Sequence, residues 1–222
     1  MAVINRAMTG AQKQARRAEI LKVAMGRFAL TSYATLSMAD IARQAGVAKG
    51  TLYLYFHSKE EMFLALCEEE LADWFAALDT ALEQRRADMS IAGLVQLFAE
   101  SIATRPYLLR LLAILHTVLE QNVDHDTALR FKTFLRERLL KTGALLEGYL
   151  RFLAPGQGVE VLLKIDALVI GLQHLAEPSE VMRAVLAQPE MAMFRVDLQQ
   201  QMLDTMKILL MGLAYEAKYK QA

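Results

Sequence analysis

The side chains of residues 49–59 are of kinds that contact nucleic acids. Lys49 carries a cation, Thr51 and Tyr53 carry hydroxyl groups, and Lys59 adds a second cation. Gly50 has no side chain, so the backbone N–H groups beside it can approach a phosphate or a base closely. The threonine can donate to a phosphate or place its methyl group against that of thymine, and the tyrosine hydroxyl can reach a phosphate oxygen. This pattern predicts contacts with DNA.

Two short helices joined by a tight turn must position these side chains. Ser37 followed by Asp40 resembles a capping box and predicts the start of a short helix. Gly46 can adopt the left-handed conformation that ends a helix, and a third helix over about residues 49–56 then follows. One helix across the DNA backbone, a turn and a second helix in the major groove make a helix-turn-helix, which we expect within residues 37–57.

The third helix should bury one face and expose the other. At 100° per residue, one arc holds Ala48, Leu52, Tyr55 and Phe56. The opposite arc holds Lys49, Gly50, Thr51, Tyr53 and Leu54. We expect the first set to pack against Phe28, Ile41 and Ala42, which leaves the second set to a partner.

Charge is unevenly distributed along the chain, although the formal net charge is zero. Residues 1–59 hold nine Lys and Arg against two Asp and Glu, a balance of +7, and the other 163 residues hold 16 basic and 23 acidic side chains, a balance of −7. A basic N-terminal part suits a protein that meets phosphates at one end. Chance clustering of arginines on a solvated helix would give the same numbers, so charge alone does not decide for DNA.

Hydrophobic periodicity predicts helices along nearly the whole chain and no strand, which gives an all-α fold. A first helix should span about residues 11–30. Ser58 and Glu61 form a second capping box, which opens a long helix to about Arg86. Further helices are expected at about 90–103, 105–121, 126–152, 158–176, 179–187 and 190–217.

The TetR/AcrR family of helix-turn-helix transcriptional regulators has a signature that this chain resembles. The matching residues are SMADIA (37–42) and AGVAKGTLYLYFHSKEEMF (45–63), preceded by Ile20-Leu21, Ala24 and Phe28 of the first helix. The resemblance covers about residues 16–65, and beyond it only length and helical character agree. It implies a helix-turn-helix domain over residues 1–58, continuous with a helical ligand-binding and dimerisation domain over residues 59–222.

The same resemblance implies a homodimer that binds a palindromic operator in double-stranded DNA and is usually released by a small molecule. Carried over by position, the DNA contacts would be Ser37, Lys49, Gly50, Thr51, Tyr53, Tyr55 and Lys59. The projection above places Tyr55 on the buried side, so we expect it at the rim of the face. The function implied is that of a repressor responsive to a largely hydrophobic ligand. A regulator without such an inducer, controlled by a protein partner or by its abundance, remains the alternative.

The helices at about 158–176 and 195–217 are the expected dimer interface, since in the resembled family the last two long helices pair with their copies. Each half-site of a palindrome needs its own recognition helix, so a dimer is required. The apolar residues that suggest the interface are Val161, Ile165, Leu168, Leu172, Leu175, Leu198, Met202, Met206, Leu209, Leu210 and Leu213. These residues could instead complete the core of one chain.

An effector pocket would lie among the middle helices. We expect it to be lined by Trp74, Phe98, Leu112, His116, Phe134 and Tyr149, with Phe131, Leu135 and Met182 as further walls. Methionine adapts to irregular apolar shapes, and the chain has 12 of them. His116 lies in an apolar run and should be buried, as a hydrogen-bonded core residue or as a ligand contact. Large apolar side chains at helical spacing also build ordinary cores.

An enzyme is disfavoured by the sequence. His57, His116, His125 and His174 are scattered without metal-binding spacing, and Asp124-His125-Asp126 is typical of a helix cap. No phosphate-binding loop or nucleophile elbow occurs, so no catalytic, metal or cofactor site is expected. Cys67 is the only cysteine, which excludes an internal disulfide. No stretch predicts a membrane span or a secretory signal, so we expect a cytoplasmic protein.

Overall fold

The computed structural model describes residues 9–84 and 90–219, and within them the backbone forms helices, turns and loops without a strand. The α-helices are α1 (Gly10–Leu30), α2 (Met38–Gln44), α3 (Lys49–Tyr53), α4 (Lys59–Gln84), α5 (Ile91–Ala103), α6 (Pro106–Ile114), α7 (His125–Tyr149), α8 (Gln157–Ala176), α9 (Glu180–Leu186) and α10 (Leu198–Tyr219). Short 3-10 segments η1 (Tyr33–Thr35), η3 (Glu120–Asn122) and η4 (Pro189–Phe194) and a π-helical segment η2 (Leu115–Leu119) join them. The predicted all-α class is confirmed.

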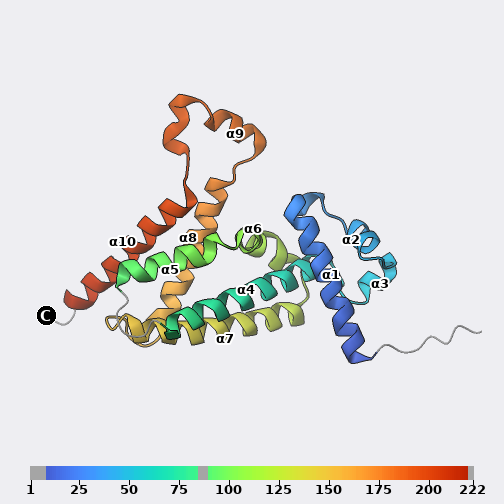
Figure 1. The fold of residues 1–222 in the computed structure, drawn as a ribbon, viewed down its shortest axis with the longest axis horizontal. Coiled ribbons are helices and arrows are strands. Elements are labelled where there is room, and N and C mark those ends of the chain that lie inside the picture. The colour runs from blue at the N-terminus through green and yellow to red at the C-terminus, as the bar shows by residue number, and fades with distance from the viewer. Residues whose placement is uncertain (1–8, 85–89, 220–222) are drawn as a thin grey trace, which may run out of the picture.

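The helices α1–α3 form a small group, here called the head, at one end of the molecule (Figure 1). A capping box begins α1: the Thr9 hydroxyl accepts from the Gln12 N–H, and the Gln12 side chain accepts from the Thr9 N–H. Ile20, Leu21 and Phe28 are buried on its inner face, as predicted. Because the inner face is held by apolar burial, the basic residues Lys13, Arg17 and Lys22 are left exposed to solvent, whereas Arg27 is partly buried.

A tight turn at Gly46 separates α2 from α3. Gly46 has φ of +65°, a conformation that side chains with a Cβ rarely adopt, and the Val47 N–H donates to the Ala42 carbonyl at 3.0 Å. The turn predicted from this glycine is therefore present. Ala48 is exposed rather than buried, because it is the extended residue that precedes α3 and the 100° projection does not apply to it.

The third helix is shorter than predicted. It ends at Tyr53, whereas the pattern predicted residues 49–56. The Leu54 and Tyr55 N–H groups donate to carbonyls three residues back, which tightens the backbone. The His57 N–H is already bonded to the Glu61 carboxylate at 2.6 Å, so the chain turns into α4.

The long helix α4 runs from the head through the body, which consists of α5–α10 (Figure 1). Its predicted end at Arg86 lies outside the described residues. Phe63 in its first turns packs edge-on against Phe28 and Tyr33, with ring centroids 5.3 and 5.0 Å apart. Since α4 contributes to both cores, the head is joined to the body by a rigid element.

Two close contacts hold α4, α7 and α8 together. A Cβ built on Gly158 would lie 2.2 Å from the Gly143 carbonyl oxygen, so only glycines allow α7 and α8 to approach this closely. Asp79, 2% exposed, accepts a 2.6 Å hydrogen bond from the Thr142 hydroxyl and pairs with the Lys141 ammonium at 2.9 Å. The buried carboxylate therefore has charged and neutral partners from α7.

Two of the helices predicted for the body are interrupted. The helix expected over 105–121 changes at Leu115 to the π-helical segment η2 and then to η3. The helix expected over 190–217 is wrong: residues 189–194 form η4, and α10 begins only at Leu198. Asp197 explains the late start, because its side chain and carbonyl accept from the Gln200 and Gln201 N–H groups and so cap α10.

None of the described helices is by itself both long and apolar enough to cross a bilayer. The α5 helix with residues 106–122 passes the same length and composition test as a pair, but the two are bent by 85° at their junction.

Candidate nucleic-acid interface and effector cavity

The outward face of α3 is formed by Lys49, Gly50, Thr51 and Tyr53. Leu52 is fully buried within α3 and holds the helix against the head. Within residues 9–84 and 90–219, the side chains of Lys49, Thr51 and Tyr53 enter no hydrogen bond or ion pair with the rest of the chain. The structure thus brings four of the predicted contact residues onto one short surface.

Gly50 is not required by the fold. Its φ is outside the positive range, and a Cβ at this position would meet no atom within 4 Å. Glycine in a helix is otherwise destabilising relative to alanine. Because Gly50 has no Cβ, the backbone at the start of α3 is open to close approach by a partner.

Ser37 is an exposed cap at the start of α2. Its hydroxyl accepts from the Asp40 N–H at 3.2 Å and donates to the Asp40 carboxylate at 2.6 Å. That hydrogen bond, together with the Arg43 guanidinium 2.6 Å away, lowers the pKa of Asp40. The predicted helix start is confirmed, and the Ser37 hydroxyl is occupied by Asp40.

The Lys59 side chain is partly buried, and its ammonium group lies against the loop between α1 and α2. Its ammonium donates to the carbonyls of Tyr33 and Leu36 at 3.0 and 3.1 Å and lies 3.9 Å from the centre of the Tyr33 ring. Burial lowers the pKa of this ammonium. Two of the three ammonium donors of Lys59 are thus used within the chain.

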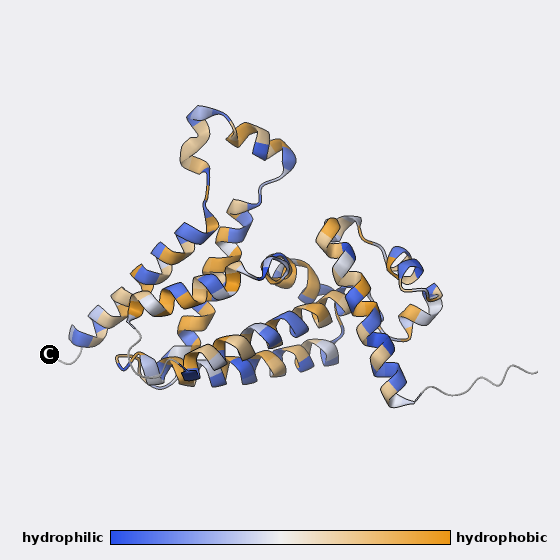
Figure 2. Ribbon diagram, in the orientation of Figure 1, coloured by the Kyte–Doolittle hydropathy of each residue, from blue (hydrophilic) through white to orange (hydrophobic). Residues whose placement is uncertain are grey.

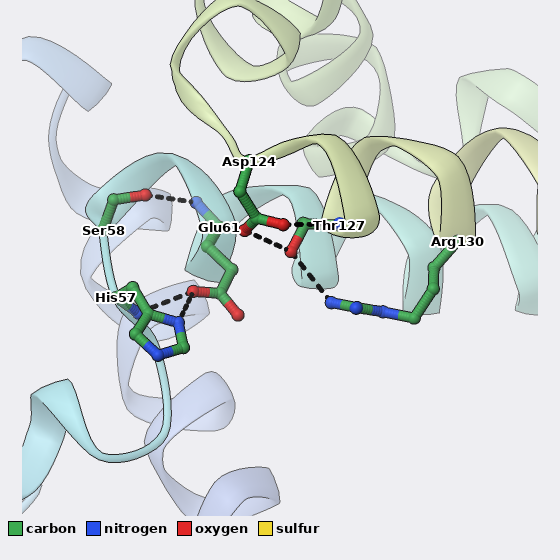
Figure 3. A network of polar contacts seen from close by, with 6 residues as sticks. All are labelled: His57, Ser58, Glu61, Asp124, Thr127 and Arg130. Carbon is green, nitrogen blue, oxygen red and sulfur yellow. Dashed lines mark hydrogen bonds and ion pairs between the residues drawn. The ribbon is translucent and has the colours of Figure 1, made fainter.

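The loop between α3 and α4 is held by the second capping box. In this box the Glu61 carboxylate bonds to the N–H of His57 and not to that of Ser58. The Ser58 hydroxyl accepts from the Glu61 N–H at 3.0 Å, as predicted. The Glu61 carboxylate accepts from the backbone N–H of His57 at 2.6 Å and lies 2.9 Å from its Nδ1 (Figure 3). Tyr55, one of the predicted contacts, is half-buried at the rim of the head core.

The start of α7 lies beside this loop. Asp124 caps α7 by accepting from the Thr127 N–H and hydroxyl at 2.9 and 2.8 Å, and Arg130 donates to the same hydroxyl (Figure 3). The prediction that Asp124 acts as a cap is confirmed. No group of three or more acidic, His or Cys side chains among the described residues has the arrangement of a metal site.

The body contains a small apolar cavity between α4, α5, α6, η2, α7 and α8. Its volume is about 50 Å³, and its polar lining residues are His116 and Asp166. Of the predicted pocket residues, it brings together Trp74, Leu112, His116 and Leu135. The other walls are Leu71, Phe75, Ile102, Leu108, Leu115, Leu139, Leu162, Leu163, Ile165 and Val169.

The remaining predicted pocket residues do not line the cavity. Phe98 is buried behind it, with its ring 6.3 Å from that of Trp74. Phe134 packs with Phe131 and Arg138 instead. The Tyr149 hydroxyl donates to the Leu82 carbonyl, and Met182 lies exposed on α9. Apolar spacing identified these side chains as inward-facing or large, but it carries no information on which of them surround a void.

His116 is exposed, which corrects the prediction of a buried histidine. The π-helical turn of η2 rotates it to the mouth of the cavity, where its Nδ1 lies 3.1 Å from Glu120 and its Nε2 lies 3.8 Å from Asp166. Lys132 pairs with the other Glu120 oxygen at 2.6 Å. Burial raises the pKa of Asp166, a residue that the sequence reading missed because it lies on a different helix.

Arg110 of α6 connects the body to the head. Its guanidinium donates to the Thr31 carbonyl at the end of α1 at 2.7 Å and lies 4.2 Å from the centre of the Phe28 ring. Leu108 and Leu112 of the same helix line the cavity. A movement of α6 at the cavity would therefore displace the Arg110 contacts with the end of α1.

Family sequence models match almost the whole of the described chain. One for bacterial regulatory proteins of the tetR family matches residues 20–66, and one for a tetracyclin repressor-like C-terminal domain matches residues 68–217. The chain belongs to the TetR family. The predicted resemblance is confirmed, and the second match extends it through the body, where no motif had been found. Membership in a family of regulatory proteins agrees with the prediction that the chain is not an enzyme.

Several named relatives share part of their length with this TetR-family chain. The HTH-type transcriptional regulator YfiR of Bacillus subtilis is 32% identical over 95 residues, 43% of this chain and 46% of that protein. The fatty acid metabolism regulator protein of Bacillus subtilis is 28% identical over 146 residues, 64% of this chain and 66% of the relative. The matched segments thus span less than two thirds of these relatives.

Solved structures share the fold of this TetR-family chain. The fatty acid degradation regulator FadR of Bacillus halodurans has a TM-score of 0.56 at 20% identity, covering 89% of this chain and 95% of its own. FadR of Bacillus subtilis in complex with stearoyl-CoA has a TM-score of 0.52 at 19% identity, covering 87% and 96%. At these identities the likeness shows the arrangement of helices.

Proposed function

We propose that the chain is a DNA-binding transcriptional repressor, released from a palindromic operator by a small, largely hydrophobic ligand. The observation that carries the DNA-binding half is the face of α3. Leu52 holds the helix in place, and Lys49, Gly50, Thr51 and Tyr53 project without intrachain polar bonds among the described residues. A short helix after a tight turn, with its start directed outward, enters the major groove in helix-turn-helix proteins.

The seven proposed contact residues have different roles. Lys49, Gly50, Thr51 and Tyr53 meet base edges and phosphates directly. Ser37, Tyr55 and Lys59 lie at the edges of the face, where each is already held within the chain. These three contact phosphates and fix the orientation of the head, so they add affinity without reading sequence.

The proposed regulator is a homodimer through α8 and α10. Several of the residues that first suggested this interface, including Val161, Ile165, Met202, Met206 and Leu210, are buried in the chain's own core. A second row on α10 remains exposed, namely Ile208, Met211, Tyr215 and Tyr219. A helix that is apolar on two faces has one for its own core and one for a partner.

The cavity is the proposed effector site. Its walls are apolar, and relatives named as fatty acid regulators, one of them solved with stearoyl-CoA, favour a ligand with a hydrophobic body. A volume of about 50 Å³ is far below the roughly 300–1,000 Å³ of ordinary ligand sites. A ligand must therefore push the helices apart, and α6, with Arg110 bonded to Thr31, transmits this movement to the head.

We place the division between a DNA-binding domain and a regulatory domain at residues 58 and 59. The start of α4 at Lys59 supports this boundary. Phe63 nevertheless packs on Phe28, so the first turns of α4 contribute to the stability of the head. The two domains are expected to unfold together.

Selection of bound sequences from random double-stranded DNA tests the proposal. We expect an enriched inverted repeat whose half-sites are centred about 10 base pairs, or a multiple of this, apart. Lys49→Ala should weaken the enrichment while circular dichroism remains that of the wild type. Failure of the folded wild type to enrich any sequence would refute DNA reading by α3.

A regulator without a small-molecule inducer is the second candidate, and the small volume of the cavity favours it. A thermal-shift series with acyl-CoA esters and free fatty acids of increasing length separates the two. Stabilisation by one length over others, lost in a Leu112→Trp variant that fills the cavity, supports the ligand-responsive repressor. No stabilisation by any of them, with operator binding intact, supports the alternative.

A further inference from the structure

Residues 177–197, here called the arm, extend away from the body between α8 and α10 (Figure 1). The arm contains α9 and η4, and neither segment has a buried residue. The element that α9 chiefly contacts is η4. The arm thus packs on itself and leaves its outer surface open.

The arm is ordered by its own hydrogen bonds. The Ser179 hydroxyl accepts from the Met182 N–H and caps α9. The Arg195 guanidinium donates to the carbonyls of Leu186, Ala187 and Gln188 at 2.6, 3.0 and 2.9 Å. These bonds hold the segment that leads from η4 to α10 against the end of α9. The arm therefore has a defined conformation.

The ordered arm presents large apolar side chains to solvent. Val181, Met182, Val185, Met193 and Phe194 are all exposed, Met193 by 82%. Hydrophobic residues stand out on α9, well away from the body (Figure 2). Their exposure in a segment fixed by specific hydrogen bonds indicates that another surface covers them.

Further exposed apolar side chains lie on α8 and α10. Leu175, at the base of the arm, is 60% exposed. On α10 the exposed row comprises Ile208, Met211, Tyr215 and Tyr219, and the two tyrosine rings lie 4.3 Å apart. The arm connects α8 directly to α10, the two helices of the proposed dimer interface.

We propose that the occupant of the arm is a second copy of this chain: each arm packs on the partner and extends the α8–α10 interface. This inference rests on the homodimer proposed above. The exposed apolar side chains of the arm and of α10 together present on the order of 800 Å², about what one partner contributes to a standard interface. Two-fold symmetry lets both arms bury their apolar residues in the same contact.

Site-specific cross-linking tests the location of the arm. Cys67 is the only cysteine and is fully buried, so a thiol introduced at the surface is the one that reacts. A Phe194→Cys variant labelled with a benzophenone maleimide and irradiated should give a species of twice 24.9 kDa. The matched control is Leu129→Cys on α7, because Leu129 is 56% exposed and Phe194 57%, and α7 lies across the body from the arm (Figure 1).

Sedimentation then tests the energetic role of the arm. The double variant Val181→Asp and Phe194→Asp should raise the dimer dissociation constant at least tenfold, because carboxylates would have to be buried. Both side chains are exposed in one chain, so circular dichroism and the melting temperature at low concentration should not change. A Tyr215→Asp variant tests the α10 interface separately.

The outcomes distinguish the arm from the dimer. Dimer cross-linking from position 194 but not from 129, with weakened association of the arm variant, supports the proposal. A wild-type dimer lost in Tyr215→Asp but unaffected by the arm variant refutes the arm contact and leaves the proposed dimer standing. A wild type that is monomeric at all concentrations refutes both.

Discussion

Substitution of Gly50 by alanine should change operator affinity and the free energy of unfolding in opposite directions. The added methyl group would meet no atom of the chain within 4 Å. Alanine is favoured over glycine inside a helix by about 0.5–1 kcal/mol, and Gly50 is the second residue of α3, so the gain in stability should be at most about 1 kcal/mol. The folded head should therefore be unchanged or slightly more stable.

Binding to the selected operator should respond in the opposite direction. If the backbone at the start of α3 approaches DNA as proposed, a methyl group there displaces the helix from the groove. We expect at least a tenfold rise in Kd, or about 1.4 kcal/mol, in fluorescence anisotropy titrations at fixed ionic strength. Chemical denaturation of the same samples measures the free energy of unfolding.

Gly26 supplies the matched control. It is an exposed glycine inside α1, and its Cβ would likewise meet nothing within 4 Å. Gly26→Ala should give a similar gain in stability with unchanged operator affinity. Wild-type affinity in Gly50→Ala would refute the close approach of α3 to DNA, and a loss of stability would show that the glycine serves the fold instead.

Three further predictions concern the face of α3, the helix crossing in the body and the cavity mouth. Lys49→Ala should weaken operator binding and reduce the slope of log K against log salt by about 1, and Tyr53→Ala should weaken binding without unfolding the head; gel-shift titrations over a salt series check both. Gly158→Ala should cost about 1–3 kcal/mol or more in urea unfolding, because its Cβ would lie 2.2 Å from the Gly143 carbonyl, whereas Gly148→Ala on open surface should not. Burial raises the folded-state pKa of Asp166 above its unfolded value of about 3.8, so stability contributed by the protonated group is lost as pH rises through the folded pKa. Asp166→Asn should therefore melt at a higher temperature than the wild type at pH 7, with a difference that shrinks below about pH 4; an equal difference at both pH values would contradict this reasoning.

The head was predictable because its determinants are local. Ser37, Gly46 and Ser58 act on residues within a few positions, as caps or as a turn, and the structure has each of them in that role. The exception is the length of α3. The Leu54 and Tyr55 N–H groups donate to carbonyls three residues back, and the His57 N–H donates to Glu61 of the next helix. Neither change leaves a mark in the periodicity of residues 49–56.

The body was predictable in class but not in its sites. Trp74, Leu112 and Leu135 were expected to face a cavity and do, but Phe98 and Tyr149 are equally large and apolar and pack elsewhere. His116 is exposed because a π-helical turn rotates it, and Asp166 reaches the same mouth from a helix some 50 residues later. A void exists only where several helices fail to fill space together, so no single stretch of sequence encodes it.

The sequence by itself determined the family, through the resemblance of residues 37–63 to a known signature. It also determined the all-α class and the residues on the outward face of α3, because caps, turns and helical periodicity act over a few residues. Only the tertiary structure decided which large side chains surround the cavity and that Lys59 is held by Tyr33 and Leu36. It also decided that α10 carries a second, unburied apolar row and that residues 177–197 project as an arm. The physical reason is that burial depends on what packs opposite a residue, and the opposite surface comes from a distant part of the chain or from another chain.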